Sequence, residues 1–406
     1  MSSADIAVVG AGPAGSAAAE RLARAGRNVL LLDKVEFPRD KFCGDGLTTL
    51  ALRQLDEMGF DPSGVPSWTP VDNAWIRSPK GKDHLIPLPD GPGLHAAIAR
   101  RSELDAALVD FAVASGAETR FGTGVSAIEP DADGITLTVG DETIRASALI
   151  AADGMWSPIR KMHGLDAGTM DGYRGEWHAF RQYFQNVGER AASELWVWFE
   201  DDILPGYAWS FPIGDGRANV GFGILRDGPI PTAEMKRIWP DLLQRPHIRE
   251  ILGPDAEPES RHRAWPIPAR VDQAPLTAPR TLFVGDAAAA CDALTGEGIG
   301  QALLTGRQAA AALLTHPTSF EAAAADYEHE VRAELVADHK MASALGKLMT
   351  NDRVAEFALT AVGTNGWTRR NFGRWLFEDY PRALIATPRR WHRGMFTGPG
   401  AYADAS

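Results

Sequence analysis

The stretch that decides the fold lies close to the N-terminus and reads Ile6-Ala-Val-Val-Gly-Ala-Gly-Pro-Ala-Gly15. Its first four residues form a short apolar run that ends in glycine, which is typical of a buried parallel strand. Residues 13–25 are rich in alanine and predict a helix, and the apolar residues 29–32 predict a second buried strand that Asp33 closes. The order of strand, glycine turn, helix and strand predicts a βαβ unit.

Each glycine of this turn has a separate physical role. Gly10 permits the tight turn, Gly12 lets a pyrophosphate approach the backbone, and Gly15 lets the helix pack closely against the strand. The N-terminus of the helix adds free N–H groups and the positive end of the helix dipole. Asp33 can accept hydrogen bonds from a ribose, and its charge would repel a 2′-phosphate. The turn therefore predicts the binding of an ADP-ribose-like group.

Two later segments extend this prediction. Asp153-Gly154 lies in the middle of the chain, and Gly285-Asp286 lies further on. Any one of the three segments is weak evidence by itself. All three, in this order and at these separations, describe a site that holds FAD. A bound flavin makes redox chemistry the leading hypothesis for the function.

The composition narrows the class of protein. The 406 residues, 45% apolar and 23% charged, are those of a globular protein with more than one structural region. The net charge of −12 argues against general binding of nucleic acid. Two cysteines, Cys43 and Cys291, imply no disulfide framework and fit a reducing compartment. We expect a cytoplasmic protein without a metal site, because the histidines show no metal-ligand spacing and no signal peptide or long apolar run occurs.

The order of the predicted elements indicates an α/β protein with an insertion. We expect a Rossmann-like FAD-binding domain, an inserted antiparallel β-sheet domain for the substrate, and a C-terminal helical region. The FAD-binding segments are predicted at 1–70, 95–170 and 266–320, the β-rich domain at 71–94 and 171–265, and the helical region at 321–406.

Further motifs resemble a known group of flavoproteins. The chain contains, in the order seen in flavoproteins with the para-hydroxybenzoate hydroxylase fold, the glycine turn, Arg101-x-x-Leu104-Asp105-x-x-Leu108, Asp153-Gly154, and Gly285-Asp286-Ala-Ala-x(7)-Gly296-Glu297-Gly298-Ile299. This similarity spans roughly residues 5–315. Within the group, two segments resemble the geranylgeranyl reductase family: Phe-Pro-Arg-Asp-Lys-Phe-Cys-Gly-Asp-Gly at 37–46 and Pro-Gly-Tyr-Ala-Trp-Ser-Phe-Pro at 205–212.

The resemblance implies an FAD-dependent reductase that saturates C=C bonds of an isoprenoid chain, either a geranylgeranyl group of a lipid or the polyprenyl chain of a quinone. Para-hydroxybenzoate-type hydroxylases commonly have His where this chain has Ala289 and Pro where it has Ala293, and halogenases have Gly-Glu-Ser where it has Cys43-Gly-Asp. A flavin-dependent monooxygenase or halogenase is nevertheless the rival enzyme, because halogenases carry a similar aromatic-Pro stretch at 205–212. A flavin-bound lipid-binding protein without turnover is a third interpretation.

The resemblance also implies roles for individual residues around the cofactor. Asp286 would hydrogen-bond the ribityl chain, while Gly296 and Gly298 would let the backbone approach the isoalloxazine ring. Arg39 and Arg101 suit the phosphate or ribityl side; the alternative for each arginine is a surface ion pair. Asp153 is expected to order the backbone near the nucleotide. The predicted cofactor residues are Gly10, Gly12, Pro13, Ala14, Gly15, Asp33, Lys34, Arg39, Cys43, Gly44, Arg101, Val125, Asp153, Gly154, Gly285, Asp286, Gly296, Gly298 and Ile299.

Protonation and substrate binding point to a second set of residues. An isolated alkene has no carbonyl to stabilise a carbanion, so its reduction needs a positioned proton donor in a site without water. Cys43 and Tyr207 are the candidate catalytic residues, and the reduced flavin is another candidate donor; the alternative for Cys43 is a packed small hydrophobe. Alternating aromatic side chains predict an apolar tunnel wall, with plain core as the alternative: Trp196, Trp198, Tyr207, Trp209 and Phe211.

The segment 366–396 differs in charge from the rest of the chain. It carries seven arginines against Glu378 and Asp379, a net charge of +5, with several Trp and Phe residues among them. This mixture suits a peripheral contact with a membrane surface. The alternative is a C-terminal cap whose arginines pair with an acidic body. NADPH or ferredoxin is the expected electron donor, and NADPH would bind transiently because no second G-x-G-x-x-G unit is evident. The oligomeric state is left open.

Overall fold

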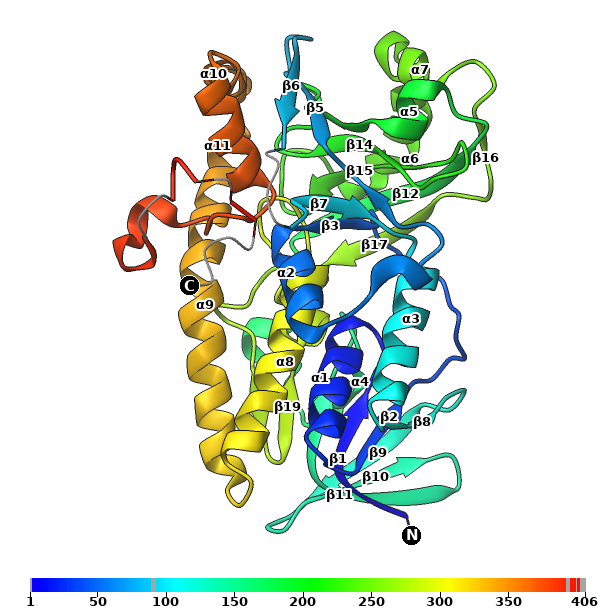
Figure 1. The fold of residues 1–406 in the computed structure, drawn as a ribbon, viewed down its shortest axis with the longest axis vertical. Coiled ribbons are helices and arrows are strands. Elements are labelled where there is room, and N and C mark those ends of the chain that lie inside the picture. The colour runs from blue at the N-terminus through cyan, green and yellow to red at the C-terminus, as the bar shows by residue number, and fades with distance from the viewer. Residues whose placement is uncertain (1, 89–92, 392–394, 399, 402–406) are drawn as a thin grey trace.

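The computed structural model describes residues 2–88, 93–391, 395–398 and 400–401. One sheet and the helices packed on it form the lower part of the molecule, and a second, antiparallel sheet forms the upper part (Figure 1). A long helix runs along one side of the lower part. The predicted class, an α/β FAD-binding fold with an inserted antiparallel sheet and C-terminal helices, is confirmed.

The lower sheet has a central parallel part that is buried on both faces. Its main strands follow the spatial order β18-β19-β11-β1-β2-β8, and β9 and β10 extend it beyond β11. The bounds are β1 Ser2–Val9, β2 Val29–Leu32, β8 Glu118–Arg120, β9 Val125–Pro130, β10 Ile135–Val139, β11 Glu142–Ala151, β18 Thr277–Ala278 and β19 Thr281–Phe283. All four residues of β2 are buried, as expected for a parallel strand covered on both sides.

The predicted βαβ unit is confirmed, since α1 (Pro13–Arg24) connects the parallel neighbours β1 and β2. It packs between α3 (Arg101–Ala114) and α8 (Ile299–Thr315). A Cβ on Gly15 would lie 1.8 Å from the carbonyl oxygen of Gly10, and one on Gly306 would lie 2.1 Å from that of Ala14. Both glycines are therefore required by close contact between backbones.

The upper sheet has the order β16-β12-β15-β14-β13-β5-β6, with β17 also paired to β12. All its pairs are antiparallel except β13 with β5. The helices α6 and α7 pack on it through an apolar cluster that includes Trp239 and Ile251. The bounds are β5 Asn73–Arg77, β6 Asp83–Pro87, β12 Trp177–Gln185, β13 Leu195–Trp198, β14 Tyr207–Pro212, β15 Ala218–Leu225, β16 Glu257–Pro258, β17 Arg263–Ile267, α5 Glu189–Ser193, α6 Met235–Gln244 and α7 Pro246–Leu252.

Shorter elements and the C-terminal helices complete the fold. A three-stranded sheet joins β3 (Gly46–Thr48), β4 (Thr69–Pro70) and β7 (Ala96–Ile98) next to α2 (Thr49–Met58). The helices α9 (Phe320–Leu348), α10 (Asp352–Val362) and α11 (Gly366–Leu376) form the predicted helical region. In Figure 1, α9 is the long helix beside α8, and α11 lies against β6. No helix within the described residues combines the length and apolar character that crossing a membrane requires.

The surroundings of Gly306 on α8 and Gly346 on α9 predict opposite effects of alanine substitution on stability. Gly306→Ala should destabilise the protein by about 1–3 kcal/mol, because the new Cβ would overlap the rigid backbone of α1. Gly346→Ala on α9 is the matched control: its Cβ would meet only Ala293 at 4.0 Å, so we expect a gain of up to about 1 kcal/mol. Thermal and denaturant unfolding measure both, and equal stabilities for the two variants would contradict the packing described.

Candidate cofactor and substrate site

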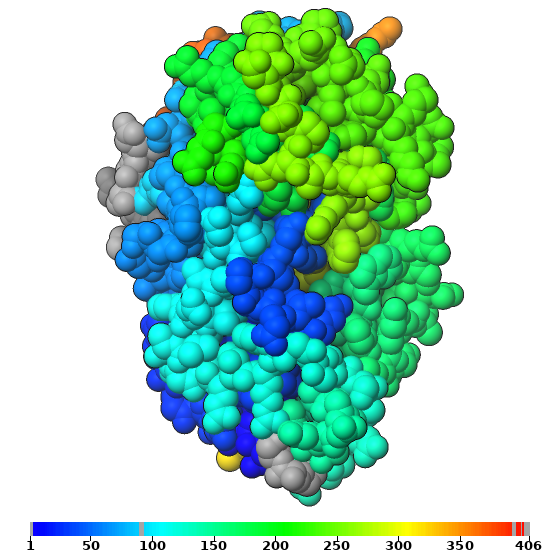
Figure 2. Space-filling model, turned by 90° about the vertical axis from the view of Figure 1, so that its right-hand side faces the viewer, coloured from blue at the N-terminus to red at the C-terminus, as the bar shows by residue number. Residues whose placement is uncertain are grey.

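A cavity of 520 Å³ lies where the carboxyl ends of the parallel strands meet the upper sheet. Figure 2 shows the segment after β2, in dark blue, lying across the junction between the two parts on one face of the molecule. Every predicted cofactor residue lines this cavity except Gly15, which instead contacts the backbone of Gly10. The structure thus gathers residues from three distant parts of the chain around one space.

The glycine turn faces two arginines. A Cβ on Gly12 would find only the guanidinium of Arg39, at 3.6 Å, and that of Arg101, at 4.0 Å. Both guanidinium groups bind the buried carboxylate of Asp105, with N–O distances of 2.7 and 2.9 Å from Arg101 and 3.1 Å from Arg39. The arginines are thus held in place beside the N-terminus of α1, which suits a pyrophosphate.

Two aspartates order the backbone around the nucleotide end. The Asp33 carboxylate accepts hydrogen bonds from the N–H groups of Ala11 (2.9 Å) and Val35 (3.2 Å), which ties the end of β2 to the glycine turn. Asp153 accepts from the Ser157 hydroxyl (2.7 Å) and the Ile159 N–H (2.9 Å). Asp153 therefore organises the start of α4 (Pro158–Met162), a structural role, while Asp33 retains acceptor capacity toward the cavity.

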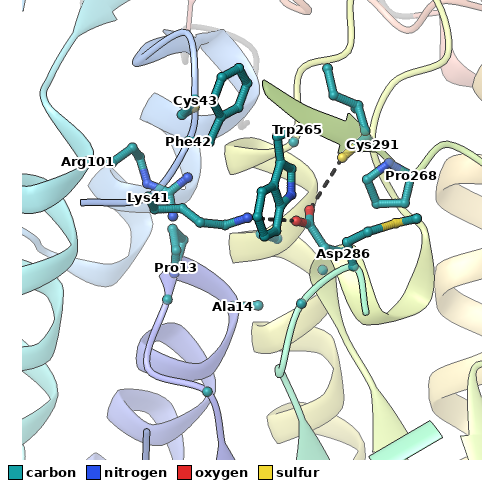
Figure 3. Close-up of a pocket in the computed structure, with 18 of the residues that line it drawn as sticks. Pro13, Ala14, Lys41, Phe42, Cys43, Arg101, Trp265, Pro268, Asp286 and Cys291 are labelled. Atoms are coloured by element: carbon teal, nitrogen blue, oxygen red, sulfur yellow. Dashed lines mark hydrogen bonds and ion pairs between the residues drawn. The ribbon is translucent and has the colours of Figure 1, made fainter. Parts of the chain in front are cut away.

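Asp286 lines the cavity and contacts Lys41, which is not among the predicted site residues. Its Oδ2 lies 3.5 Å from the Lys41 ammonium, and the Cys291 thiol donates to its Oδ1 at 3.5 Å (Figure 3). The same ammonium lies 4.5 Å from the centre of the Trp265 ring. Lys41 belongs to the 37–46 motif, so a signal existed for it. Trp265 lies in β17, where nothing in the local sequence distinguishes it from core.

The Gly296-Glu-Gly298 turn lies at the start of α8 and forms another part of the cavity wall. Gly296 has a φ of +72°, which favours glycine, and a Cβ on Gly298 would lie 2.7 Å from the Cys291 sulfur. The N–H groups of Gly298 and Ile299 donate to Oε1 of Glu297 at 3.1 and 3.0 Å. The resemblance implies that the backbone of this turn approaches the isoalloxazine ring. In the structure these N–H groups bind the Glu297 carboxyl, so the free donors at this end of α8 already have an acceptor within the protein.

The turn that carries Cys43 is held by a buried polar network that the sequence did not reveal. Its carbonyl oxygen accepts from Arg181 (3.2 Å) and Asn219 (3.0 Å). Asn219 and the Tyr183 hydroxyl also donate to the fully buried Asp45, at 2.8 and 2.7 Å. Burial raises the pKa of Asp45 to about 6, against the opposing effect of Arg181. The only local signal was the presence of polar residues inside otherwise apolar strands.

Cys43 itself faces the cavity next to an aromatic wall. Burial is the main cause that raises the pKa of its thiol to about 11, with Arg101 acting in the opposite sense, so the thiol is neutral at pH 7. A Cβ on the adjacent Gly44 would lie 3.6 Å from Phe211 and 3.8 Å from Trp209. The cysteine turn therefore packs directly on the wall.

The predicted aromatic wall requires a correction. Tyr207, Trp209 and Phe211 line the cavity, whereas Trp196 and Trp198 lie in the buried cluster under α6 and α7. The strand register explains the difference. Trp196 pairs with Ser210 and Trp198 with Ala208, and residues directly opposite in an antiparallel pair share a face. The two tryptophans thus point away from the face that carries Trp209.

The comparisons with known proteins agree with this arrangement. The family described as FAD binding domain matches residues 3–333. A menaquinone reductase of Mycolicibacterium smegmatis is 36% identical over 333 residues, 76% of this chain and 75% of that protein. Digeranylgeranylglycerophospholipid reductase 1 of Methanopyrus kandleri is 32% identical over 328 residues, 75% and 78% of the two chains. A geranylgeranyl bacteriochlorophyll reductase-like structure from Thermoplasma acidophilum has the same fold, with TM-score 0.78, 21% identity and coverage of 96% and 99%.

The space above Gly12 predicts a variant that folds but does not bind the cofactor. Gly12→Val adds a side chain beside the two guanidinium groups, where the pyrophosphate would lie, and its Cβ would meet no backbone atom within 4 Å. We expect an unchanged melting temperature of the cofactor-free protein and a loss of FAD affinity of about 100-fold or more, roughly 3 kcal/mol. Fluorescence titration with FAD measures this loss. Gly64→Val, at an exposed glycine with nothing within 4 Å, should bind normally; normal FAD affinity in Gly12→Val would refute the assignment.

Proposed function

We propose a reaction for this protein, which belongs to the FAD-binding flavoproteins and, within them, to the geranylgeranyl reductase family. The reaction is the saturation of C=C bonds in an isoprenoid chain. The protein is an FAD-dependent oxidoreductase. The observation that carries the proposal is that the predicted cofactor residues, the Cys43 turn and the aromatic wall line one continuous cavity. The names of the relatives, a menaquinone reductase and a digeranylgeranylglycerophospholipid reductase, support substrates with isoprenoid chains.

The residues around the cavity divide between cofactor and substrate. Arg39 and Arg101 would hold the pyrophosphate, Asp33 the ribose and Asp286 the ribityl chain, and FAD, once reduced, would supply a hydride. The wall of Tyr207, Trp209 and Phe211 would hold the hydrocarbon chain and exclude water. An apolar wall needs few polar contacts to bind such a chain, which fits a substrate whose reacting part carries no charge.

Cys43 and Tyr207 are best suited to positioning the substrate. The Tyr207 hydroxyl donates to the carbonyl oxygen of Thr295, so its proton is already used within the protein. Burial is also the main cause that raises the pKa of the Tyr207 hydroxyl above its usual value, so this hydroxyl is a weak acid. The neutral thiol of Cys43 is a weak acid too, but its place between the wall and the turn suits contact with an alkene.

The proposal is tested with purified FAD-loaded protein, a chemical reductant and two lipid classes, a geranylgeranyl lipid and a prenylated quinone. Each reduced double bond should add two mass units to the lipid. NADPH and ferredoxin are then compared as physiological donors. Oxygen consumption coupled to product would instead indicate a monooxygenase, and bound flavin that no reductant reduces would indicate a binding protein.

A serine at position 43 tests the positioning role of the thiol. Cys43→Ser should keep FAD, because Arg39, Arg101 and Asp286 remain to hold it, yet lower the turnover or change which double bonds are reduced. We expect the turnover to fall by about tenfold, which is less than the 10²–10⁴-fold effect typical of a general acid. Product analysis by mass spectrometry measures both. Unchanged rate and products in Cys43→Ser would leave Cys43 as a packing residue.

We further propose that the C-terminal segment contacts a lipid bilayer, from which an isoprenoid lipid would be taken. The structure corrects the basis of this expectation. Arg374 and Arg382 are buried and paired with Asp379 and Asp292, and Arg390 pairs with Asp338 at 3.0 Å. These three arginines therefore fit the alternative prediction, a C-terminal cap whose arginines pair with acidic residues of the protein. Arg393 lies outside the described residues.

What supports the bilayer contact is the apolar surface of the same segment. Exposed fractions are 58% for Trp367, 84% for Ile385 and 50% for Trp391, and Arg389 is exposed beside them in sequence. Large exposed apolar side chains with a nearby cation suit the interface of a membrane.

Vesicle sedimentation tests this contact. The triple change Trp367→Ser, Ile385→Ser and Trp391→Ser should weaken binding to anionic vesicles by about tenfold or more, and most of the loss should persist at high salt because burial of apolar area is not screened. Val113→Ser, at a valine on α3 that is 45% exposed, is the control and should bind normally. Arg390→Gln should lower the melting temperature instead, since it removes an internal ion pair. Undiminished binding of the triple variant would rule out the bilayer contact.

A further inference from the structure

We infer that Glu297 donates the proton that the alkene receives during reduction, and that Glu378 acts through Glu297 as a positioning residue. The inference rests on the proposed function. It assigns a role that neither Cys43 nor Tyr207 fills, because both are held as weak acids. In the sequence, nothing distinguishes Glu297 except its position between Gly296 and Gly298.

Glu297 lies where a proton donor is needed, on the wall of the cavity that would hold the alkene. Its partly exposed side chain lines the same cavity as Cys43 and the aromatic wall. The N–H groups of Gly298 and Ile299 bind Oε1, which fixes the carboxyl group and leaves Oε2 to carry the proton. The Tyr207 hydroxyl binds the carbonyl of Thr295, so the residue that forms the wall is attached to the turn that carries Glu297.

The surroundings of Glu297 favour the protonated acid. Burial is the main cause that raises its pKa to about 8, and the nearby Glu378 carboxyl raises it further, while the two N–H bonds and Arg101 lower it. The thiol of Cys43 has a pKa of about 11, so Glu297 is the stronger acid and is still protonated at neutral pH. The titratable groups that interact with it are Glu378, Arg101, Cys43, Tyr207 and Cys291.

Glu378 is held in a fixed position behind the turn. The Thr48 hydroxyl donates to its Oε2 at 2.5 Å, and the Gln301 amide donates to its Oε1 at 2.8 Å. The Arg382 guanidinium lies 3.7 Å away but is shared with Asp292, at 3.2 Å. Two carboxylates thus share one arginine, and burial is the main cause that raises the pKa of Glu378 as well. A negative charge on Glu378 disfavours a second one on Glu297. Glu378 is a positioning residue that acts through Glu297.

The reaction balances with these groups. The O–H bond of Glu297 and the π bond of the alkene break, and one carbon gains the proton while its neighbour gains the hydride of reduced FAD. The substrate is reduced by two electrons, both from the hydride, and the flavin is oxidised by two. Glu297 is left as a carboxylate, which regains a proton from water before the next turnover.

This assignment fixes the sign of the pH dependence. Only the protonated form of Glu297 can donate, so the rate should be high below its pKa and fall as the pH rises through about 8. Removing the negative charge in Glu378→Gln lowers the pKa of Glu297, so the fall should begin at a lower pH. A purely structural loss would reduce the rate equally at every pH.

The first test compares variants of the FAD-loaded enzyme. Glu297→Gln keeps the size of the side chain and its oxygen acceptor but cannot donate a carboxyl proton, so kcat should fall by about 100-fold or more with FAD affinity unchanged. Glu297→Asp should restore part of the rate. Glu257→Gln, at an exposed residue of β16, is the matched control and should behave as the natural protein. Full activity with an unchanged pH profile in Glu297→Gln would overturn the inference.

The second test does not depend on turnover. Infrared difference spectra of the oxidised, FAD-loaded protein should show a carboxylic acid C=O band that disappears as the pH is raised through about 8. The band should be missing in Glu297→Gln and should titrate at lower pH in Glu378→Gln. An ionised Glu297 at pH 7 would overturn the inference even if no substrate were known. If the band behaves as expected but no isoprenoid lipid is reduced, the proposed function fails and the acidity of Glu297 stands.

Discussion

The structure depends on one point at which three distant segments of the chain bring their backbones together without side chains between them. A Cβ on Gly10 would lie 2.1 Å from the carbonyl oxygen of Ala152, one on Gly15 1.8 Å from that of Gly10, and one on Gly306 2.1 Å from that of Ala14. The ends of β1 and β11, the start of α1 and the body of α8 can approach only because these glycines are present. This contact sets the distance between the nucleotide end of the cavity and the Gly296-Glu-Gly298 turn that precedes α8.

Several buried arginines of the site pair with carboxylates, whereas Asp45 and Glu297 have no ion pair within the described residues. Arg39 and Arg101 share Asp105, and Arg382 serves both Asp292 and Glu378. Burying an unpaired carboxylate is costly, so such a group takes up a proton instead. Glu297 has backbone donors and no cation of its own among its hydrogen-bond partners within the described residues, and burial raises its pKa to about 8. A protonated carboxyl in an apolar cavity is what alkene protonation requires.

The C-terminal region forms part of the site as well as its outer cover. The N–H of Thr49 donates to the carbonyl of Phe377 at 2.8 Å, and Thr48 binds Glu378, so the chain just after the Cys43 turn is attached to the end of α11. Arg382 then reaches Asp292, next to Cys291 on the cavity wall. The seven arginines of 366–396, read from composition alone, suggested a membrane contact. Three of them form internal ion pairs instead, with Asp379, Asp292 and Asp338. The exposed Trp367, Ile385 and Trp391 are the observation that supports a bilayer contact.

The sequence by itself determined the βαβ unit, the cofactor class and the family, because these follow from short motifs whose chemistry is local: a glycine must be where a backbone or a phosphate comes close. All but one of the predicted cofactor residues line a single cavity for that reason. Tertiary structure alone decided which tryptophans face the cavity. The register of β13 and β14 turns Trp209 toward the cavity and Trp198 into the buried cluster under α6 and α7. It also decided the pairing of Asp45 with Tyr183, 138 positions apart, and the approach of Glu378 to Glu297. Acidity in a protein depends on burial and on neighbouring charge, and both arise only when distant segments fold together.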